Sequence, residues 1–273
     1  MSTAARQVPP PDTLDCKKIE QFHRDGYMIL ENWIDTETLA MLREECAYFM
    51  GYKDAELDFS GRDTDMITQR GNRYFIYNWY RKSRRMWRFI FSPMMAALTR
   101  AVLGEDVYLF HEQWVVKGAE QGMPFNWHQD SAYVRNFDPG TRHKPFLTCW
   151  CPLDDVGIEN GSVYLLPHDR GGTRGGLVPH RQDPVIKDLI ADNHGDPGMP
   201  ICVKAGTIVA FSSLVLHSSG ANRTSEMRRV YLPQYSCEPI IDSQTGQPLK
   251  LATPFVKAGR LVYDHRADLN ASA

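Results

Sequence analysis

Apolar residues in the first hundred positions recur every three or four residues, the spacing at which side chains share one face of an α-helix. The longest such stripe consists of Leu39, Leu42, Cys46 and Phe49. Residues that favour helix ends flank three segments of this kind: Asp15, Asp35 and Ser92-Pro93 precede them, and Gly26 and Gly104 follow the first and the third. The pattern therefore predicts three capped helices, with a short strand over residues 27–30 after the first.

From Val107 onward the pattern changes to short β-rich runs that are separated by turn residues. These runs are VYLFHEQWVV, FNWHQD, FLTCWCPL, SVYLLP, TIVAFSS and VYLPQYS. None is followed by the helix that a parallel β-α-β unit requires, so an antiparallel barrel or a double-sheet jelly roll is favoured. The predicted fold class is mainly β, with N-terminal and flanking helices.

The same pattern predicts one domain over residues 13–273. Its helical layer lies mainly in residues 13–104, its barrel mainly in residues 105–240, and its C-terminal extension in residues 241–273. Residues 1–12 contain three consecutive prolines and little hydrophobic surface, so a mobile tail is expected there. Residues 171–200 are rich in Gly, Pro, Asp and Arg and are expected to form a long loop over the barrel mouth.

Composition narrows the functional classes without selecting one. The 273 residues are 42% hydrophobic and 23% charged, with a formal net charge of −2. This balance argues against nucleic acid or membrane partners. Six scattered cysteines and the absence of a signal pattern favour a cytoplasmic protein. Cys149 and Cys151 lack a second cysteine pair, so we expect them to be buried small side chains rather than metal ligands.

Three residues are candidate metal ligands. If FNWHQD is a strand, His128 and Asp130 leave the same face, because side chains two residues apart point to one side. By itself such a pair is more often merely solvated, and a lone His217 would more often be a core histidine. His217 follows the run TIVAFSSLV, and a barrel can bring its mouth next to Asp130. Two histidines and one aspartate form the facial triad that holds Fe(II) and leaves positions open.

Polar residues after His217 predict an anion site. An arginine on the next strand can grip a carboxylate bidentately, and the nearby Ser219 hydroxyl can donate to it. Strand alternation lets only one of Arg228 and Arg229 face inward, and the other is expected to be solvated. Such a site suits a dicarboxylate such as 2-oxoglutarate. Lys117 is expected to be a solvated lysine at a strand end.

The chain resembles the Fe(II)/2-oxoglutarate-dependent oxygenases of the phytanoyl-CoA dioxygenase family. FHRDGY (22–27) is similar to that family's F-x-x-D-G-Y/F opening, and WCPLDD (150–155), ENGS (159–162) and HQD (128–130) match further motifs. The resemblance implies a double-stranded β-helix of the jelly-roll, cupin-like type. It also implies iron held by His128, Asp130 and His217, and 2-oxoglutarate held by Arg228 and Ser219. By the same resemblance, the wall of the cosubstrate site consists of Gln113, Thr148 and Trp150.

One departure from the family concerns His168. Pro167 is followed directly by His168-Asp169 where the family has Gly-Ser-His, so His168 is expected to be an ordinary loop histidine.

The resulting hypothesis is an O2-dependent hydroxylase that acts on an unactivated C–H bond of a small molecule and releases succinate and CO2. Desaturation, epimerisation and ring closure stay open, whereas Asp130 argues against halogenation because that chemistry leaves the carboxylate position empty. The alternatives are a cupin-type metal enzyme, such as an isomerase, that does not use 2-oxoglutarate, and a binding barrel without catalysis.

The substrate class stays open between anionic or zwitterionic metabolites, acyl thioesters and secondary-metabolite scaffolds. The aromatic and basic segment 72–88 could form a pocket wall, but a solvated basic face is favoured for residues 81–88.

Overall fold

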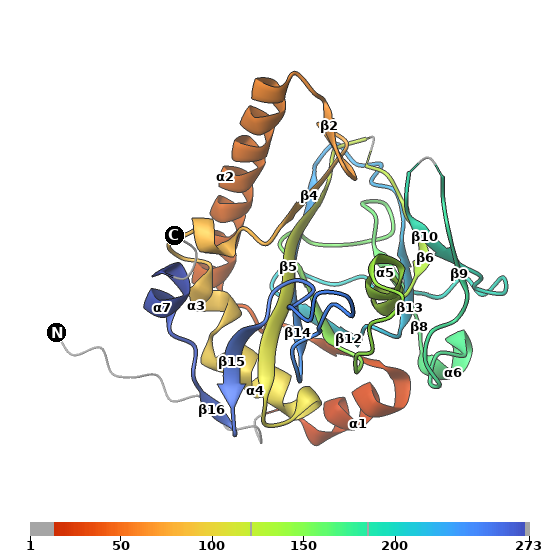
Figure 1. Ribbon diagram of the computed structural model, residues 1–273. Helices are drawn as coiled ribbons and strands as arrows, with labels where there is room; N and C mark the ends of the chain where they lie inside the picture. The colour runs from red at the N-terminus through yellow and green to blue at the C-terminus, as the bar shows by residue number, and fades with distance from the viewer. Residues whose placement is uncertain (1–13, 121, 185, 271–273) are drawn as a thin grey trace.

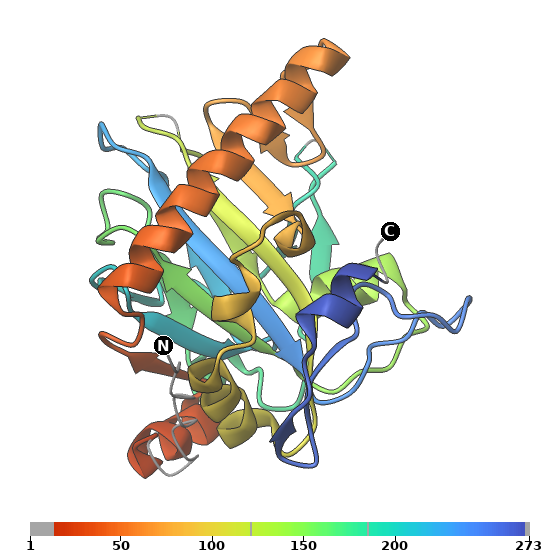
Figure 2. The same cartoon turned by 90° about the vertical axis from the view of Figure 1, so that its left-hand side faces the viewer.

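The computed structural model describes residues 14–120, 122–184 and 186–270. The tail predicted for residues 1–12 lies outside the described residues. Two antiparallel sheets face each other, and the N-terminal helices cover the outer side of the larger one (Figures 1 and 2). The helices are α1 (Cys16–Asp25), α2 (Thr36–Ser60), α3 (Trp87–Ile90), α4 (Pro93–Leu103), α5 (Asp130–Phe137), α6 (His168–Gly171) and α7 (His265–Asn270), with a 3-10 turn at Tyr80–Lys82.

The larger sheet has the strand order β1-β12-β7-β14-β5-β4-β3-β2, with β15 also pairing with β5 and β16 pairing with β15. Its strands are β1 (Tyr27–Leu30), β2 (Thr64–Asp65), β3 (Thr68–Gln69), β4 (Arg73–Tyr77), β5 (Val107–Lys117), β7 (Leu147–Pro152), β12 (Ile208–Ser212), β14 (Arg228–Ser236), β15 (Thr253–Lys257) and β16 (Arg260–Leu261). The smaller sheet has the order β11-β8-β13-β6. Its strands are β6 (Phe125–His128), β8 (Val163–Leu166), β11 (Met199–Pro200) and β13 (Leu216–Ser219).

The predicted helix caps are confirmed. The carboxylates of Asp15 and Asp35 accept hydrogen bonds from the amides of Lys17 and Thr38 at 3.0 and 2.7 Å. Ser92 caps α4 through the amide of Met95 at 3.2 Å. Gly26 ends α1 at φ 86°, a left-handed conformation in which a side chain would also collide with His168 and Val215.

Two hydrophobic layers lie on the two sides of the larger sheet. The outer layer joins the helices to the sheet and includes Leu42 and Phe49 of α2. Figure 2 shows the helix α2 lying across the strands. The inner layer fills the space between the sheets and includes Trp150, Leu165 and Val209. Polar residues that interrupt this inner layer therefore project into the space between the sheets.

Three expectations need correction. The described strands form two facing sheets rather than a closed barrel. The segment expected to be a loop contains the hairpin β9 (His180–Gln182) and β10 (Leu189–Ala191), and it ends in β11. Asp130 is the first residue of α5 and does not continue the strand β6.

The buried cysteine pair is as expected, because Cys149 and Cys151 are both 0% exposed in β7. Within residues 14–120, 122–184 and 186–270, none of the helices combines the length and the apolar character needed to cross a membrane.

Candidate metal and cosubstrate site

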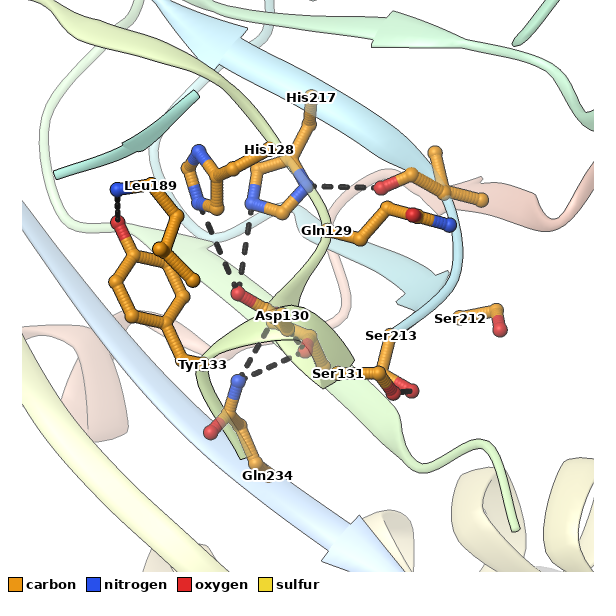
Figure 3. A network of polar contacts seen from close by, with 12 residues as sticks. His128, Gln129, Asp130, Ser131, Tyr133, Leu189, Ser212, Ser213, His217 and Gln234 are labelled. Atoms are coloured by element: carbon orange, nitrogen blue, oxygen red, sulfur yellow. Dashed lines mark hydrogen bonds and ion pairs between the residues drawn. The ribbon is translucent and has the colours of Figure 1, made fainter. Parts of the chain in front are cut away.

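The structure brings the three candidate metal ligands together. His128 ends β6 and pairs directly with His217 on β13, so their rings lie 4.1 Å apart. The Nε2 atoms of His128 and His217 lie 3.9 and 3.6 Å from Oδ1 of Asp130 (Figure 3). One ligand atom from each residue lies within 4.8 Å of the other two. The three donor atoms are therefore close enough to bind a single metal ion, all from the same side of the ion.

Asp130 reaches this position by a backbone path that the sequence did not predict. Gln129 is extended, with φ −113° and ψ 136°, so it continues the direction of β6 for one more residue before α5 begins. His128 and Asp130 consequently still project to the same side. Asp130 also lies in the first turn of α5, where the helix dipole favours a negative charge.

Backbone carbonyls orient both histidines. Nδ1 of His128 donates to the carbonyl of Asn126 at 2.7 Å, and Nδ1 of His217 donates to that of Val215 at 3.0 Å. These bonds place the proton on Nδ1 and leave the Nε2 lone pair free for a metal. Desolvation, followed by the charge of His217, lowers the pKa of His128 to about 3, so that imidazole is neutral at physiological pH.

The Asp130 carboxylate is oriented from the larger sheet. Thr148 Oγ1 and Gln234 Nε2 donate to its Oδ2 at 2.6 and 3.0 Å, and Oδ1 is left facing the histidines. Thr148 was expected to be part of the cosubstrate wall, and it contacts the carboxylate of the candidate metal ligand Asp130. Gln234 was not among the predicted site residues. The signal in the sequence was its spacing, because Gln234 lies six residues from Arg228 on one strand and so shares its face.

Gln129 connects the site to the segment over it. Its side-chain amide nitrogen donates to the carbonyls of Gly176 and Leu214, and its amide oxygen accepts from the backbone of Val178 at 2.8 Å. The side chain is 0% exposed. The residue between the two ligands thus fixes the chain that leads into β9.

A cluster of buried cations lies along the strands from this triad. Arg228 pairs in register with Lys117 on β5, which pairs with Arg73 on β4, so the three form one row across the sheet. Their side chains are 1%, 0% and 1% exposed. Neither Lys117 nor Arg228 forms an ion pair with any residue in the described part of the chain.

The row is electrostatically incomplete. Nη2 of Arg228 donates to the carbonyl of Gly161 at 3.1 Å, while its Nε and Nη1 are buried with no hydrogen-bond partner among the described residues. Burial lowers the pKa of Arg228 to about 10. Desolvation is the largest of the causes that hold the pKa of Lys117 well below its usual value, and the charges of Arg228 and Arg73 lower it further. An anion bound beside these groups would offset the cost of burying their charges.

Lys117 corrects the expectation of a solvated lysine. Its Nζ donates to Ser219 Oγ at 2.8 Å and also to the carbonyl of Gly220. Strand alternation carried the signal, since His111, Gln113, Val115 and Lys117 share one face of β5. Ser219 is two residues from His217 on β13, about 7 Å along the strand. A five-carbon dicarboxylate could extend over that distance from the triad to the cation cluster.

The other residues predicted to hold the cosubstrate differ in where they lie relative to the cation cluster. Arg229 points away from the cluster and pairs with Asp154 at 2.6 Å, so Arg228 is the inward residue and Arg229 is not merely solvated. The ring centroid of Trp150, 5% exposed, lies 5.7 Å from Arg228 Cζ. Gln113 is partly exposed on the inner face of β5.

Other candidate residues lie outside the site. His168 is buried beside Gly26 and bonds Thr173 Oγ1 at 2.8 Å, which is a structural role. The solvated basic face expected for residues 81–88 is present in part: Lys82, Arg84 and Arg88 are exposed. Arg81 and Arg85 are half-buried and pair with Asp268 and with Glu44 and Glu45.

Comparison with known proteins is consistent with this arrangement. The family model described as phytanoyl-CoA dioxygenase (PhyH) matches residues 22–230. Ectoine dioxygenase of Bordetella bronchiseptica is 27% identical over 230 residues, covering 77% of this chain and 71% of that protein. L-proline trans-4-hydroxylase of Streptomyces griseoviridis is 29% identical over 169 residues, covering 55% of this chain and 62% of that protein.

A solved structure shows the same fold. EvdO2 from Micromonospora carbonacea var. aurantiaca, complexed with 2-oxoglutarate, matches with a TM-score of 0.66 at 23% identity. The match covers 89% of this chain and 98% of EvdO2.

Proposed function

The chain belongs to the phytanoyl-CoA dioxygenase family of Fe(II)- and 2-oxoglutarate-dependent oxygenases, and from that premise we propose that it hydroxylates an unactivated C–H bond of a small molecule. In this proposal His128, Asp130 and His217 hold the iron, and succinate and CO2 are released. Iron with bound 2-oxoglutarate supplies the activation of O2 that this chemistry requires. The two facing sheets are then the halves of a double-stranded β-helix.

The donor set fits Fe(II). Two imidazoles and one carboxylate are the ligands that non-haem iron oxygenases use, and here the three donors converge on one point. Both imidazoles offer Nε2, and the Asp130 oxygen that faces them is the one that Thr148 and Gln234 leave free. These second contacts fix the ligand orientations before metal binds.

The cation cluster is the observation that carries the 2-oxoglutarate assignment. Arg228 and Lys117 are buried without a carboxylate partner in the described part of the chain, and Lys117 is bonded to Ser219, two residues from His217. Binding a dianion there would compensate their desolvation. A metal enzyme of this fold that did not use 2-oxoglutarate would have no need for such a cluster.

The relatives suggest the scale of the substrate. Their printed names give ectoine and L-proline as the molecules acted on, and both are small. We therefore propose a metabolite of comparable size for this protein. Asp130 occupies the carboxylate position, which favours hydroxylation over halogenation.

The test is anaerobic reconstitution with Fe(II), followed by addition of 2-oxoglutarate. We expect one iron per chain and a weak visible charge-transfer band that grows with 2-oxoglutarate. In air, succinate release should rise when a substrate from an amino-acid or related metabolite panel is present. His217→Ala should lose the band while keeping a cooperative unfolding transition. An unchanged spectrum for the wild type would refute the proposal.

A further inference from the structure

Lys250 lies near the metal site at the end opposite the cation cluster. Neither the iron assignment nor the 2-oxoglutarate assignment gives this lysine a role. It belongs to the segment after β14, and its backbone is fixed on both sides. The amide of Leu249 donates to the carbonyl of Ile240 at 2.8 Å, and the amide of Leu251 donates to that of Phe110 at 3.0 Å. Lys250 is therefore positioned beside the start of β5 rather than on a free loop.

The Lys250 ammonium is accessible and lies against an aromatic ring. The residue is exposed, and its Nζ lies 5.8 Å from the centroid of the Phe110 ring. It is near enough to Asp130 and His111 to interact with their charges. Desolvation lowers its pKa to about 8, and Asp130 partly offsets that effect. An exposed ammonium that is close to both the Phe110 ring and a metal-ligand candidate can contact a molecule bound beside the triad.

Lys250 also differs from other lysines in having no carboxylate partner among the described residues. Four lysines in the described part of the chain do pair with carboxylates: Lys53 with Glu56 at 3.2 Å and with Asp65, Lys144 with Glu238 at 3.1 Å, Lys204 with Asp155 at 2.7 Å and Lys257 with Asp106 at 2.8 Å. Lys250 has neither an ion pair nor a hydrogen bond to any residue that the structure describes. Its charge is available to a ligand.

Lys250 approaches the metal site from the end opposite the cation cluster. Phe110 and Lys117 lie seven residues apart on β5, about 23 Å along the strand. Asp130 lies near the Phe110 end, because Gln234, which donates to it, pairs with His111. An anion at Lys250 would consequently be distinct from the far carboxylate of 2-oxoglutarate.

Tyr133 provides a second accessible wall near the triad. It is 38% exposed, its ring lies 5.4 Å from that of His128, and its hydroxyl accepts from the amide of Leu189 at 3.2 Å (Figure 3). The aromatic ring and the ammonium together suit a small molecule with one apolar part and one anionic group.

We propose that Lys250 binds an anionic group of the substrate, a carboxylate in the form tested below, and so selects anionic or zwitterionic small molecules. This inference rests on the proposed function, because it assumes that the triad holds the metal and the cation cluster holds 2-oxoglutarate.

The test uses trifluoroacetate as a carboxylate probe and needs no knowledge of the substrate. The protein is loaded with paramagnetic Co(II) in place of iron and with saturating 2-oxoglutarate, and broadening of the 19F resonance reports a probe near the metal. We expect concentration-dependent broadening in the wild type and affinity that is roughly 10- to 100-fold weaker in Lys250→Met, the loss typical of a charge-assisted contact. Lys250→Arg should retain most of the affinity.

Lys257→Met is the matched control, because Lys257 also lies near an aromatic ring, 4.7 Å from that of Tyr108, but pairs with Asp106. It should bind the probe as the wild type does. Neutral trifluoroethanol should not distinguish the wild type from Lys250→Met.

Several results would overturn the inference. They are absence of broadening in the wild type, equal broadening in the wild type and Lys250→Met, and weaker 2-oxoglutarate binding in Lys250→Met, which would assign the lysine to the cosubstrate. Failure of the wild type to bind 2-oxoglutarate at all would instead remove the proposed function. The two failures are thus separable, and thermal unfolding of each variant checks that it is folded.

Discussion

Replacing Arg228 by methionine tests how 2-oxoglutarate is held. Methionine keeps much of the side-chain volume but removes the guanidinium, whose Nε and Nη1 have no hydrogen-bond partner among the described residues. The iron ligands are on other elements, so iron should still bind. The affinity for 2-oxoglutarate should fall sharply, because its far carboxylate would lose the fork of donors that the arginine provides.

The size of the loss follows from burial. Arg228 is 1% exposed, so the contact is made with little water present. Truncating one partner of a buried, hydrogen-bonded charge pair costs about 2 to 5 kcal/mol, which corresponds to a roughly 30- to 4,000-fold rise in Kd. Lys117 and Ser219 stay in place, so we expect the lower part of that range. High 2-oxoglutarate should restore activity.

The assay is an anaerobic titration of the Fe(II) protein with 2-oxoglutarate, followed by the charge-transfer band. Arg229→Met is the control, because Arg229 pairs with Asp154 and points away from the cluster. A normal Kd for Arg228→Met together with a raised Kd for Arg229→Met would show that the wrong arginine has been assigned. If both variants and Arg223→Met bind 2-oxoglutarate normally, the clamp itself is refuted.

Three further outcomes can be measured. Asp130→Gly removes the anionic metal ligand, so iron analysis should show weaker binding that saturating 2-oxoglutarate does not restore; full iron content would exclude Asp130 as a ligand. Gln234→Leu deletes one of the two donors to Asp130 Oδ2 and should weaken iron affinity roughly 10- to 100-fold in a chelator competition, whereas unchanged affinity would mean that Thr148 alone orients the carboxylate. Burial raises the pKa of Glu112 from 4.5 to about 7, so the folded state holds its proton more tightly, and the stability this provides is present below pH 4.5 and lost as pH rises through about 7. Between pH 4.5 and pH 8 the free energy of unfolding of Glu112→Gln should therefore rise by about 3 kcal/mol relative to that of the wild type, as measured by denaturant titrations. If the free energies of unfolding of the two proteins changed in parallel with pH, this prediction would be contradicted.

Local sequence patterns were sufficient for the capped helices, for strands such as β5, β7 and β14, and for the three ligand candidates. Caps such as Asp35 and Ser92 act on amides three residues away, so the sequence alone locates the helix starts. The i, i+2 spacing of His128 and Asp130 likewise holds their side chains on one side, although Asp130 begins a helix. These effects depend on neighbours within a few residues, which is why they can be read without a fold.

Contacts between distant segments decided what the sequence left open. Alternation allowed one inward arginine, but only the pairing of Arg229 with Asp154 identifies Arg228 as that residue. Lys117 reads as a solvated strand end until Ser219, 102 positions away, is placed beside it. The donation from Gln234 to Asp130 similarly joins segments 104 residues apart. Burial and hydrogen bonding of this kind arise only when the two sheets pack together, so the tertiary structure, and not local pattern, determines the charge state and the orientation of these side chains.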